Sequence, residues 1–312
     1  MNPYWGNTGI DFFITLFRRL KGDIPLNQLP SDEVQMLVLI GIGCACAGIG
    51  TFLTLKKMTM IANAISHTIL LGIVIACLIL GTTQLTFFVL LIASLLAALI
   101  TTFLTQLLTQ LFKLQEDASI GLIFTSLFAL GIVLVTLFTR NAHLGVEAIT
   151  GNVDALHVHD LQLVGWVAGI DLVVCLLLYK ELQVTAFDPA YANTMGISSS
   201  RFNLLLLMIT AMTTVAALRS VGVILVLTFI VGPPLIARLW THRLPSLLLL
   251  ATAIGAGVSI FGVALSRHLL SVYNLPLSTG GLVATLIGIT YIISLTSTHL
   301  LRKVQHHEIG KR

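Results

Sequence analysis

Charged side chains are scarce in this sequence. Its 312 residues include 13 acidic and 17 basic residues, so charged residues make up 10% of the chain, where about 25% is usual in soluble proteins. A soluble chain of this length would need a polar surface around roughly two domains, and the sequence holds too few polar side chains to form one. The formal net charge of +4 is too dilute for a nucleic-acid-binding face. A soluble enzyme and a DNA-binding protein are therefore both excluded.

The sequence also lacks the motifs of an ATP-hydrolysing subunit and of common hydrolases. It contains no Gly-x-x-x-x-Gly-Lys-Ser/Thr sequence, no Gly-x-Ser-x-Gly and no His-Glu-x-x-His. We therefore expect a chain that is not an enzyme and binds no cofactor of its own. Energy for any uphill transport would come from a partner or an ion gradient. The four cysteines all fall within apolar segments, which predicts neither a disulfide framework nor a zinc knuckle.

Long uncharged apolar segments account for most of the chain. A membrane-spanning helix needs about 20 predominantly apolar residues, and the uncharged run 58–112 is long enough for two crossings. The pattern predicts an all-α polytopic membrane protein with about nine transmembrane helices, within a range of about eight to ten. The predicted spans are about 34–55, 58–80, 85–110, 119–139, 161–179, 203–219, 221–239, 246–266 and 281–301.

The distribution of lysine and arginine predicts the orientation of these helices. If the spans alternate, one set of connections carries eleven of the 17 basic residues. Because short basic loops stay in the cytoplasm, we expect the C-terminus in the cytoplasm and the N-terminus outside. Arg18, Arg19 and Lys21 oppose this orientation. The connections predicted to be cytoplasmic are 56–57, 113–118, 180–201, 238–245 and 302–312.

The two ends of the chain differ from its apolar middle. Residues 1–33 form an N-terminal segment whose apolar part, 10–20, is too short to span and has no signal-peptide cleavage site. An amphipathic helix on the membrane surface fits this segment better. The sequence therefore predicts an interfacial segment at 1–33, a transmembrane domain at 34–301 and a basic cytoplasmic tail at 302–312.

A few polar residues fall inside the predicted spans, where burial is costly and function is common. Asn63 and His67 are four residues apart and share one face of a helix. Asp171 lies at a similar depth, about 15 Å into its span at 1.5 Å per residue, so the depths allow His67 and Asp171 to meet. Imidazole and carboxylate ligands suit Mn²⁺, Fe²⁺ or Zn²⁺. The alternative is that each side chain only satisfies a hydrogen bond within the bundle. The connection 140–160 holds further possible ligands that are more simply explained as solvated loop residues.

The longest predicted cytoplasmic connection contains the signals of a short helix. Asp188 is a favourable N-cap and Pro189 suits the first helical position. Gly196 can adopt the left-handed conformation that ends a helix. These residues predict a helix of about seven residues within 188–196, about 10 Å long, which either reverses the chain or docks on a partner.

Several motifs follow one another in a fixed order along most of the chain. In combination they resemble the integral-membrane permeases of bacterial ABC importers for manganese, zinc and iron, and are most similar to those of chlamydial type. Two positions depart from the family pattern: Asn63 stands in place of an aspartate and Leu71 in place of a proline. The motifs are Lys56-Lys57 with 62–72 (ANAISHTILLG), 117–121 (DASIG) with 128–131 (FALG), 180–182 (KEL) with 187–189 (FDP), 219–226 (RSVGVILV), Pro233/Pro234 with Ala237-Arg238, and Leu275-Pro276 with Thr279-Gly280.

The resemblance implies a type II ABC importer permease in the bacterial inner membrane, which moves divalent metal ions while a separate subunit hydrolyses ATP. It implies as partners cytoplasmic ABC ATPase subunits, a periplasmic metal-binding protein and a second permease subunit, identical or a sister chain. The helix at 188–196 would be the coupling helix seated on the ATPase. Its predicted residues are Phe187, Asp188, Pro189, Ala190, Tyr191 and Gly196.

The residues expected along the translocation path are Asn63, Ser66, His67 and Asp171, with His67 as a transient metal ligand. The main alternative function is a proton-coupled secondary carrier for metal ions or another small solute, in which His67 and Asp171 relay the proton. Dependence of transport on a partner ATPase distinguishes the two. A membrane scaffold or an intramembrane enzyme is a third reading, and it predicts no loss of metal uptake when the gene is deleted.

Overall fold

The computed structural model describes residues 9–21, 30–81, 86–139 and 153–309 of the chain. These ranges are helical apart from short connections and contain no strand. Nine of the described helices are long and apolar enough to cross a membrane, which confirms the predicted fold class. They are α2 (Ser31–Leu55), α3 (Thr59–Leu80), α4 (Phe87–Leu111), α5 (Glu116–Thr139), α7 (Val158–Leu177), α10 (Ser199–Val221), α11 (Val223–Trp240), α12 (Leu244–Tyr273) and α13 (Thr279–Ile309).

Four shorter helices complete the described chain. The amphipathic helix expected near the N-terminus is α1 (Gly9–Leu20), and it packs against α12. The 3-10 turn η1 (Val153–Ala155) precedes α7. Sequence patterns did not predict α8 (Tyr179–Phe187), which follows α7 after one residue, whereas they did predict the helix that follows it, α9 (Pro189–Thr194).

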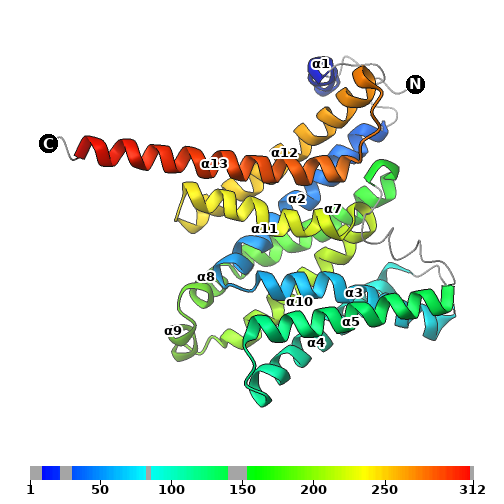
Figure 1. The fold of residues 1–312 in the computed structure, drawn as a ribbon, viewed down its shortest axis with the longest axis vertical. Helices are drawn as coiled ribbons and strands as arrows, with labels where there is room; N and C mark the ends of the chain where they lie inside the picture. The colour runs from blue at the N-terminus through cyan, green and yellow to red at the C-terminus, as the bar shows by residue number, and fades with distance from the viewer. Residues whose placement is uncertain (1–8, 22–29, 82–85, 140–152, 310–312) are drawn as a thin grey trace.

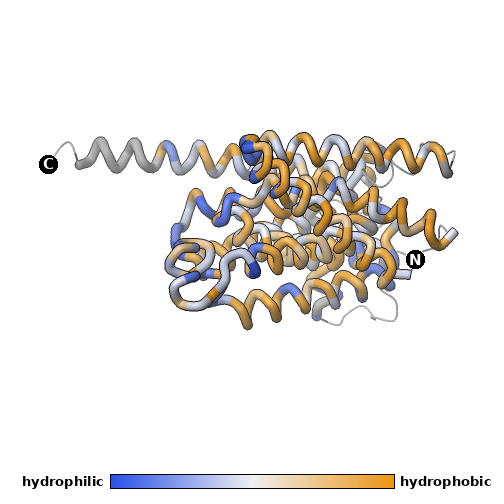
Figure 2. Tube along the Cα trace, turned by 90° about the horizontal axis from the view of Figure 1, so that it is seen from below, coloured by the Kyte–Doolittle hydropathy of each residue, from blue (hydrophilic) through white to orange (hydrophobic). Residues whose placement is uncertain are grey.

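The helices run side by side and their connections gather at two ends (Figure 1). We call them the α9 end, where α8, α9 and the last turns of α13 lie, and the α1 end, where α1 and the connection from α12 to α13 lie. The connections predicted to share the cytoplasmic side gather at the α9 end. Apolar residues cover the lengths of the helices, and hydrophilic residues concentrate toward the helix ends (Figure 2).

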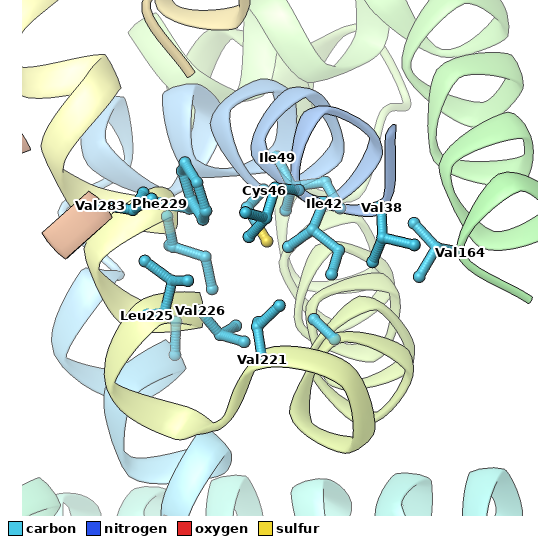
Figure 3. Packing of buried hydrophobic residues seen from close by; sticks show 14 of the residues in the cluster. Val38, Ile42, Cys46, Ile49, Val164, Val221, Leu225, Val226, Phe229 and Val283 are labelled. Carbon is cyan, nitrogen blue, oxygen red and sulfur yellow. The ribbon is translucent and has the colours of Figure 1, made fainter. Parts of the chain in front are cut away.

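The central element is α2, which packs against α12, α11, α7 and α10. Figure 3 shows Ile42 and Cys46 of α2 facing Val226 and Phe229 of α11 in a core of fully buried side chains. Small residues let the backbones approach closely, as is usual between helices in membranes. A Cβ atom on Gly50 would overlap the carbonyl oxygen of Ile230 on α11.

Proline affects α11 less than the sequence suggests. Residues 232–234 break the expected helical pattern, yet α11 continues through Pro233 and Pro234 to Trp240. Both prolines are buried, so packing against α2 and α13 holds the helix together although each proline removes a backbone hydrogen bond. The interruption at 275–278 is real, because it separates α12 from α13. The segment predicted as a tail from 302 begins as a continuation of α13, up to Ile309.

Two of the basic residues at the α1 end are paired with acidic residues in the first turn of α2. Arg19 Nε lies 2.6 Å from Glu33 Oε1, and Arg267 forms an ion pair with Asp32. Pairing neutralises these charges locally. Orientation follows the count of lysine and arginine and depends little on acidic residues, so Arg19 and Arg267 still oppose the predicted orientation.

Candidate functional site

His67 lies near the middle of α3 and packs against two aromatic rings of α5. Its ring centroid is 4.9 Å from that of Phe124 and 5.2 Å from that of Phe128. Because Phe124 and Phe128 are one turn apart on α5, both reach the same side chain of α3. The imidazole is half-buried, and its Nδ1 atom has no hydrogen-bond partner among the described residues. An imidazole with a free nitrogen can take a proton or a metal ion.

Asn63 precedes His67 by one turn of α3 and is also half-buried, so the two side chains share a partly open face. Ser66 lies elsewhere on the helix and is fully buried. Its hydroxyl donates to the carbonyl oxygen of Ala62 at 2.9 Å. Of the predicted α3 residues, the structure brings Asn63 and His67 to one face and turns Ser66 into the protein.

Asp171 is the charged residue in the interior of α7, and its side chain is directed into the subunit with 2% exposure. Thr213 Oγ1 of α10 donates to Asp171 Oδ2 at 2.7 Å, while Oδ1 has no partner among the described residues. A buried carboxylate with one hydrogen bond is energetically costly. Its bond to Thr213 therefore restricts how α7 can move relative to α10.

The structure gives His67 and Asp171 separate surroundings. The helix α3 packs mainly against α4 and α5, whereas α7 packs mainly against α2 and α10. None of the described contacts joins the two side chains, so the meeting that their similar depth allows does not occur in this conformation. Within the described residues, no three His, Cys, Asp or Glu side chains gather where they could hold a metal ion.

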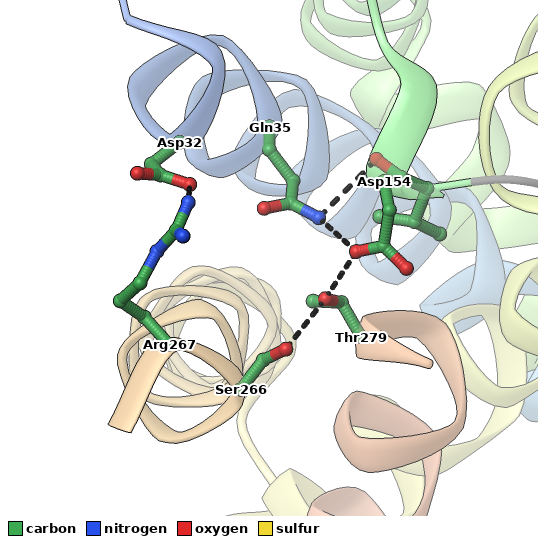
Figure 4. Close-up of polar contacts among 7 residues, drawn as sticks. Asp32, Gln35, Asp154, Ser266, Arg267 and Thr279 are labelled. Atoms are coloured by element: carbon green, nitrogen blue, oxygen red, sulfur yellow. Dashed lines mark hydrogen bonds and ion pairs between the residues drawn. The ribbon is translucent and has the colours of Figure 1, made fainter. Parts of the chain in front are cut away.

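The connection before α7 is mainly structural where it is described. Of the possible ligands in the connection 140–160, His143 and Glu147 lie outside the described residues. His157 and Asp160 form a capping box that starts α7, in which the His157 N–H donates to Asp160 Oδ2 at 3.0 Å. Asp154 Oδ1 accepts hydrogen bonds from Gln35 Nε2 at 2.8 Å and Thr279 Oγ1 at 2.6 Å (Figure 4).

A polar cluster at the α1 end includes these bonds and was not expected from the sequence. Ser266 is hydrogen-bonded to Thr279 at 2.9 Å, and Arg267 pairs with Asp32 on the other side of the cluster (Figure 4). The cluster borders a cavity of about 440 Å³ between α2, α12 and the start of α13. The only available signal was that polar residues flank the ends of three predicted spans. That signal does not say which of them meet.

The short helix α9 has the caps that the sequence predicts. Asp188 Oδ1 accepts a hydrogen bond from the Tyr191 N–H at 2.9 Å, Pro189 occupies the first turn, and Gly196 has φ +82°. Phe187, Tyr191 and Met195 are exposed by 60%, 54% and 59%. Met195 was not among the predicted residues of this surface. Three large apolar side chains thus project at the α9 end around a helix that is fixed at both ends.

The nine apolar helices of the described residues, with a capped short helix at one end of the bundle, define a multi-pass membrane protein. The chain belongs to the ABC 3 transport family, which matches residues 33–298. It is therefore a permease subunit of an ABC transporter in the bacterial inner membrane, as the sequence motifs predicted.

Relatives and a solved structure agree with this assignment. The chain is 34% identical over 297 residues to the "Probable metal transport system membrane protein" of Chlamydia trachomatis serovar D, covering 95% of this chain and 93% of that protein. It is 35% identical over 267 residues to the manganese transport system membrane protein MntD of Bacillus subtilis, covering 81% and 87%. The fold is similar to PsaBC from Streptococcus pneumoniae in complex with Fab, with a TM-score of 0.74 and 24% identity, over 86% of this chain and 92% of that chain.

Proposed function

We propose that this chain provides the path by which divalent metal ions, manganese, zinc or iron, enter the bacterial cytoplasm. The observation that carries the proposal is membership of the ABC 3 family together with metal-transport relatives at 34% and 35% identity. The transported ion is the cargo of the chain. The complete importer would contain two permease subunits, two cytoplasmic ATPase subunits and a periplasmic metal-binding protein.

Asn63 and His67 form the accessible part of the proposed path. Their shared, partly open face offers one amide oxygen and one imidazole nitrogen near the middle of α3. Two neutral ligands hold a divalent ion weakly, which suits passage better than storage. The remaining ligands would come from water or a second subunit. Ser66 and Asp171 are buried in this conformation, so they would reach the ion only after the surrounding helices move.

The proposed contact with the ATPase is the surface formed by Phe187, Tyr191 and Met195 around α9. Large apolar side chains exposed on a helix with a fixed start and end are typical of a protein–protein interaction site. Ala192, the next residue on α9 after Tyr191, is fully buried and anchors the helix to the permease. Closure of the ATPases would push α9 as a unit and so transmit movement to α8 and α10, which both contact it.

Metal uptake in cells lacking the gene tests the function. Deletion should reduce uptake of at least one of Mn²⁺, Fe²⁺ and Zn²⁺, and the wild-type gene should restore it. His67→Ala should restore less than about a tenth of that uptake. His242→Ala, which changes an exposed histidine in the connection from α11 to α12, should restore it fully. Full uptake with His67→Ala would refute the proposed path, and unchanged uptake of all three metals after deletion would refute metal import.

A further inference from the structure

A second large cavity lies at the α9 end, between α4, α9 and the first turn of α10. Its volume is about 800 Å³. Lys56, which follows α2, and Arg201 of α10 line it together with Glu116 of α5. The surface of this cavity is partly polar, unlike the apolar groove between α3 and α4. Nothing in the proposed metal path uses it.

The charges around this cavity favour an anion. Lys56 Nζ donates to Thr185 Oγ1 at 2.9 Å and to Asn203 Oδ1 at 2.8 Å, and both partners are neutral. An ammonium group has three donors, so one remains for a ligand. Burial lowers the pKa of Lys56 to about 8, which leaves it protonated at neutral pH. The cavity is lined by two basic residues and one acidic residue, so its net charge is positive. A divalent cation would be repelled from it.

The first turn of α10 adds to this positive potential. Ser199, Ser200 and Arg201 line the cavity. Ser198 makes no side-chain capping bond there, and the Ser199 N–H donates to Asn193 Oδ1 at 3.0 Å, which leaves the following N–H groups of the first turn. The start of a helix carries partial positive charge from its unpaired N–H groups. Lys56, Arg201 and this helix start therefore act on the same space.

The other walls combine polar and apolar groups, as a lipid headgroup site requires. A face of α4 presents Thr102, Thr105, Gln106, Thr109 and Gln110 to the cavity. The three threonine hydroxyls already donate to carbonyl oxygens of their own helix, which leaves their oxygens as acceptors. The apolar residues Phe103 and Leu204 also line the cavity and are exposed, so the cavity continues onto a surface suited to acyl chains.

We propose that this cavity binds the headgroup of an anionic phospholipid, with its phosphate at Lys56 and Arg201 and its acyl chains over Phe103 and Leu204. Basic pockets between helices near the cytoplasmic face are suited to such headgroups. The headgroup hydroxyls would bond to the glutamine and threonine side chains of α4. A lipid here would tie α4 to α10 beside α9, where the permease contacts its ATPase in the proposed importer.

Native mass spectrometry of the full-length chain in detergent tests the proposal. Phosphatidylglycerol should remain bound, whereas phosphatidylcholine should bind at least about fivefold more weakly. The double variant Lys56→Gln/Arg201→Gln should bind phosphatidylglycerol about 25-fold more weakly, about fivefold for each base. The matched control Lys180→Gln/Arg243→Gln removes two exposed bases at the same end and should bind like the wild type.

Two single variants keep the test valid if the double variant fails to fold. Arg201 is exposed, so Arg201→Gln should weaken binding about fivefold without changing the melting temperature. Glu116→Gln removes the opposing charge and should tighten binding. Equal binding of both lipids, or equal loss in the control variant, would overturn the proposal.

Two further results would overturn the lipid assignment. Inorganic phosphate at millimolar concentration displacing phosphatidylglycerol would identify a soluble anion as the ligand. Loss of bound lipid whenever two chains associate would show that a second copy covers the cavity.

Discussion

Most buried hydroxyl groups in this protein bond to the carbonyl oxygen one turn earlier in their own helix. Thr51, Thr210 and Thr214 do so at 2.7 to 2.8 Å. Such bonds let polar residues occupy apolar helices at little cost. The Asp171 carboxylate cannot be satisfied in this way, and it depends on Thr213 of another helix. His67 keeps a nitrogen without a partner among the described residues. These two residues are therefore where single substitutions should matter most.

Asn63→Asp would put a carboxylate one turn from His67. A charged oxygen binds a divalent ion more strongly than an amide oxygen, so Mn²⁺ affinity of the purified chain should rise at least about tenfold, or about 1.4 kcal/mol. Isothermal titration calorimetry measures this change. Asn274→Asp, which adds the same charge at the α1 end, should leave the affinity unchanged. An unaltered affinity in Asn63→Asp would remove residue 63 from the path.

Thr213→Val should leave the buried Asp171 without its hydrogen-bond donor. Leaving a buried polar group without its partner destabilises a protein by about 1–3 kcal/mol, so the melting temperature in detergent should fall. Thr214→Val is the matched control, because the Thr214 hydroxyl donates only within its own helix. The two variants melting alike would mean that the bond to Asp171 contributes nothing to stability.

At the scale of elements, α2 is held by close backbone contact on two sides. Gly43 and Gly255 face each other, and a Cβ on Gly255 would lie 2.8 Å from the Gly43 carbonyl oxygen. Gly50 makes the corresponding contact with α11. At the α9 end, the capping residues of α9 define where the helix starts and ends, and its exposed side chains project from it. The position of α2 thus depends on tight packing, whereas the start and end of α9 depend on local capping.

Gly50→Val should disrupt the contact between α2 and α11. Overpacking a well-packed core costs about 1–3 kcal/mol, and a backbone carbonyl cannot move aside as a flexible side chain can. Gly48→Val is the control on the same helix, since nothing lies within 4 Å of its added Cβ. Thermal unfolding in detergent should show a lower melting temperature for Gly50→Val alone. Equal destabilisation by both variants would contradict this packing.

Tyr191→Ala should reduce ATP-driven transport at least about tenfold while the melting temperature stays the same, because an exposed anchor residue contributes to docking more than to folding. Trp240→Ala removes another exposed aromatic residue at the α9 end and should transport normally. Binding of the ATPase subunit should weaken in parallel with transport. Normal ATPase binding by Tyr191→Ala would exclude this residue from the docking surface.

At the scale of the whole molecule, the charged residues that the structure describes lie toward the ends of an apolar bundle, with Asp171 as the exception. Basic residues at the α9 end include Lys113, Lys180, Arg238 and Arg243, whereas Arg19 and Arg267 at the α1 end are paired with acidic residues. The cytoplasmic position of the α9 end remains a prediction of this asymmetry. The same end holds α9, so α9 can contact a cytoplasmic ATPase only if this end faces the cytoplasm.

Features fixed by short stretches of sequence could be predicted, and features fixed by tertiary packing could not. The nine spans follow from the length of apolar helix that a membrane requires, and α9 follows from Asp188 and Gly196. Spacing placed Asn63 and His67 on one face, but it could not show that Phe124 and Phe128 pack against His67. The network of Gln35, Asp154 and Thr279 joins residues more than a hundred positions apart, and no local pattern encodes it.

The most direct test of the account is transport by the purified permease in liposomes, with and without its ATPase subunit. The account predicts that Mn²⁺, Zn²⁺ or Fe²⁺ accumulates only when the ATPase and ATP are both present, and that a proton gradient alone drives no accumulation. Metal accumulation driven by a proton gradient without the ATPase would contradict it and would identify a secondary carrier.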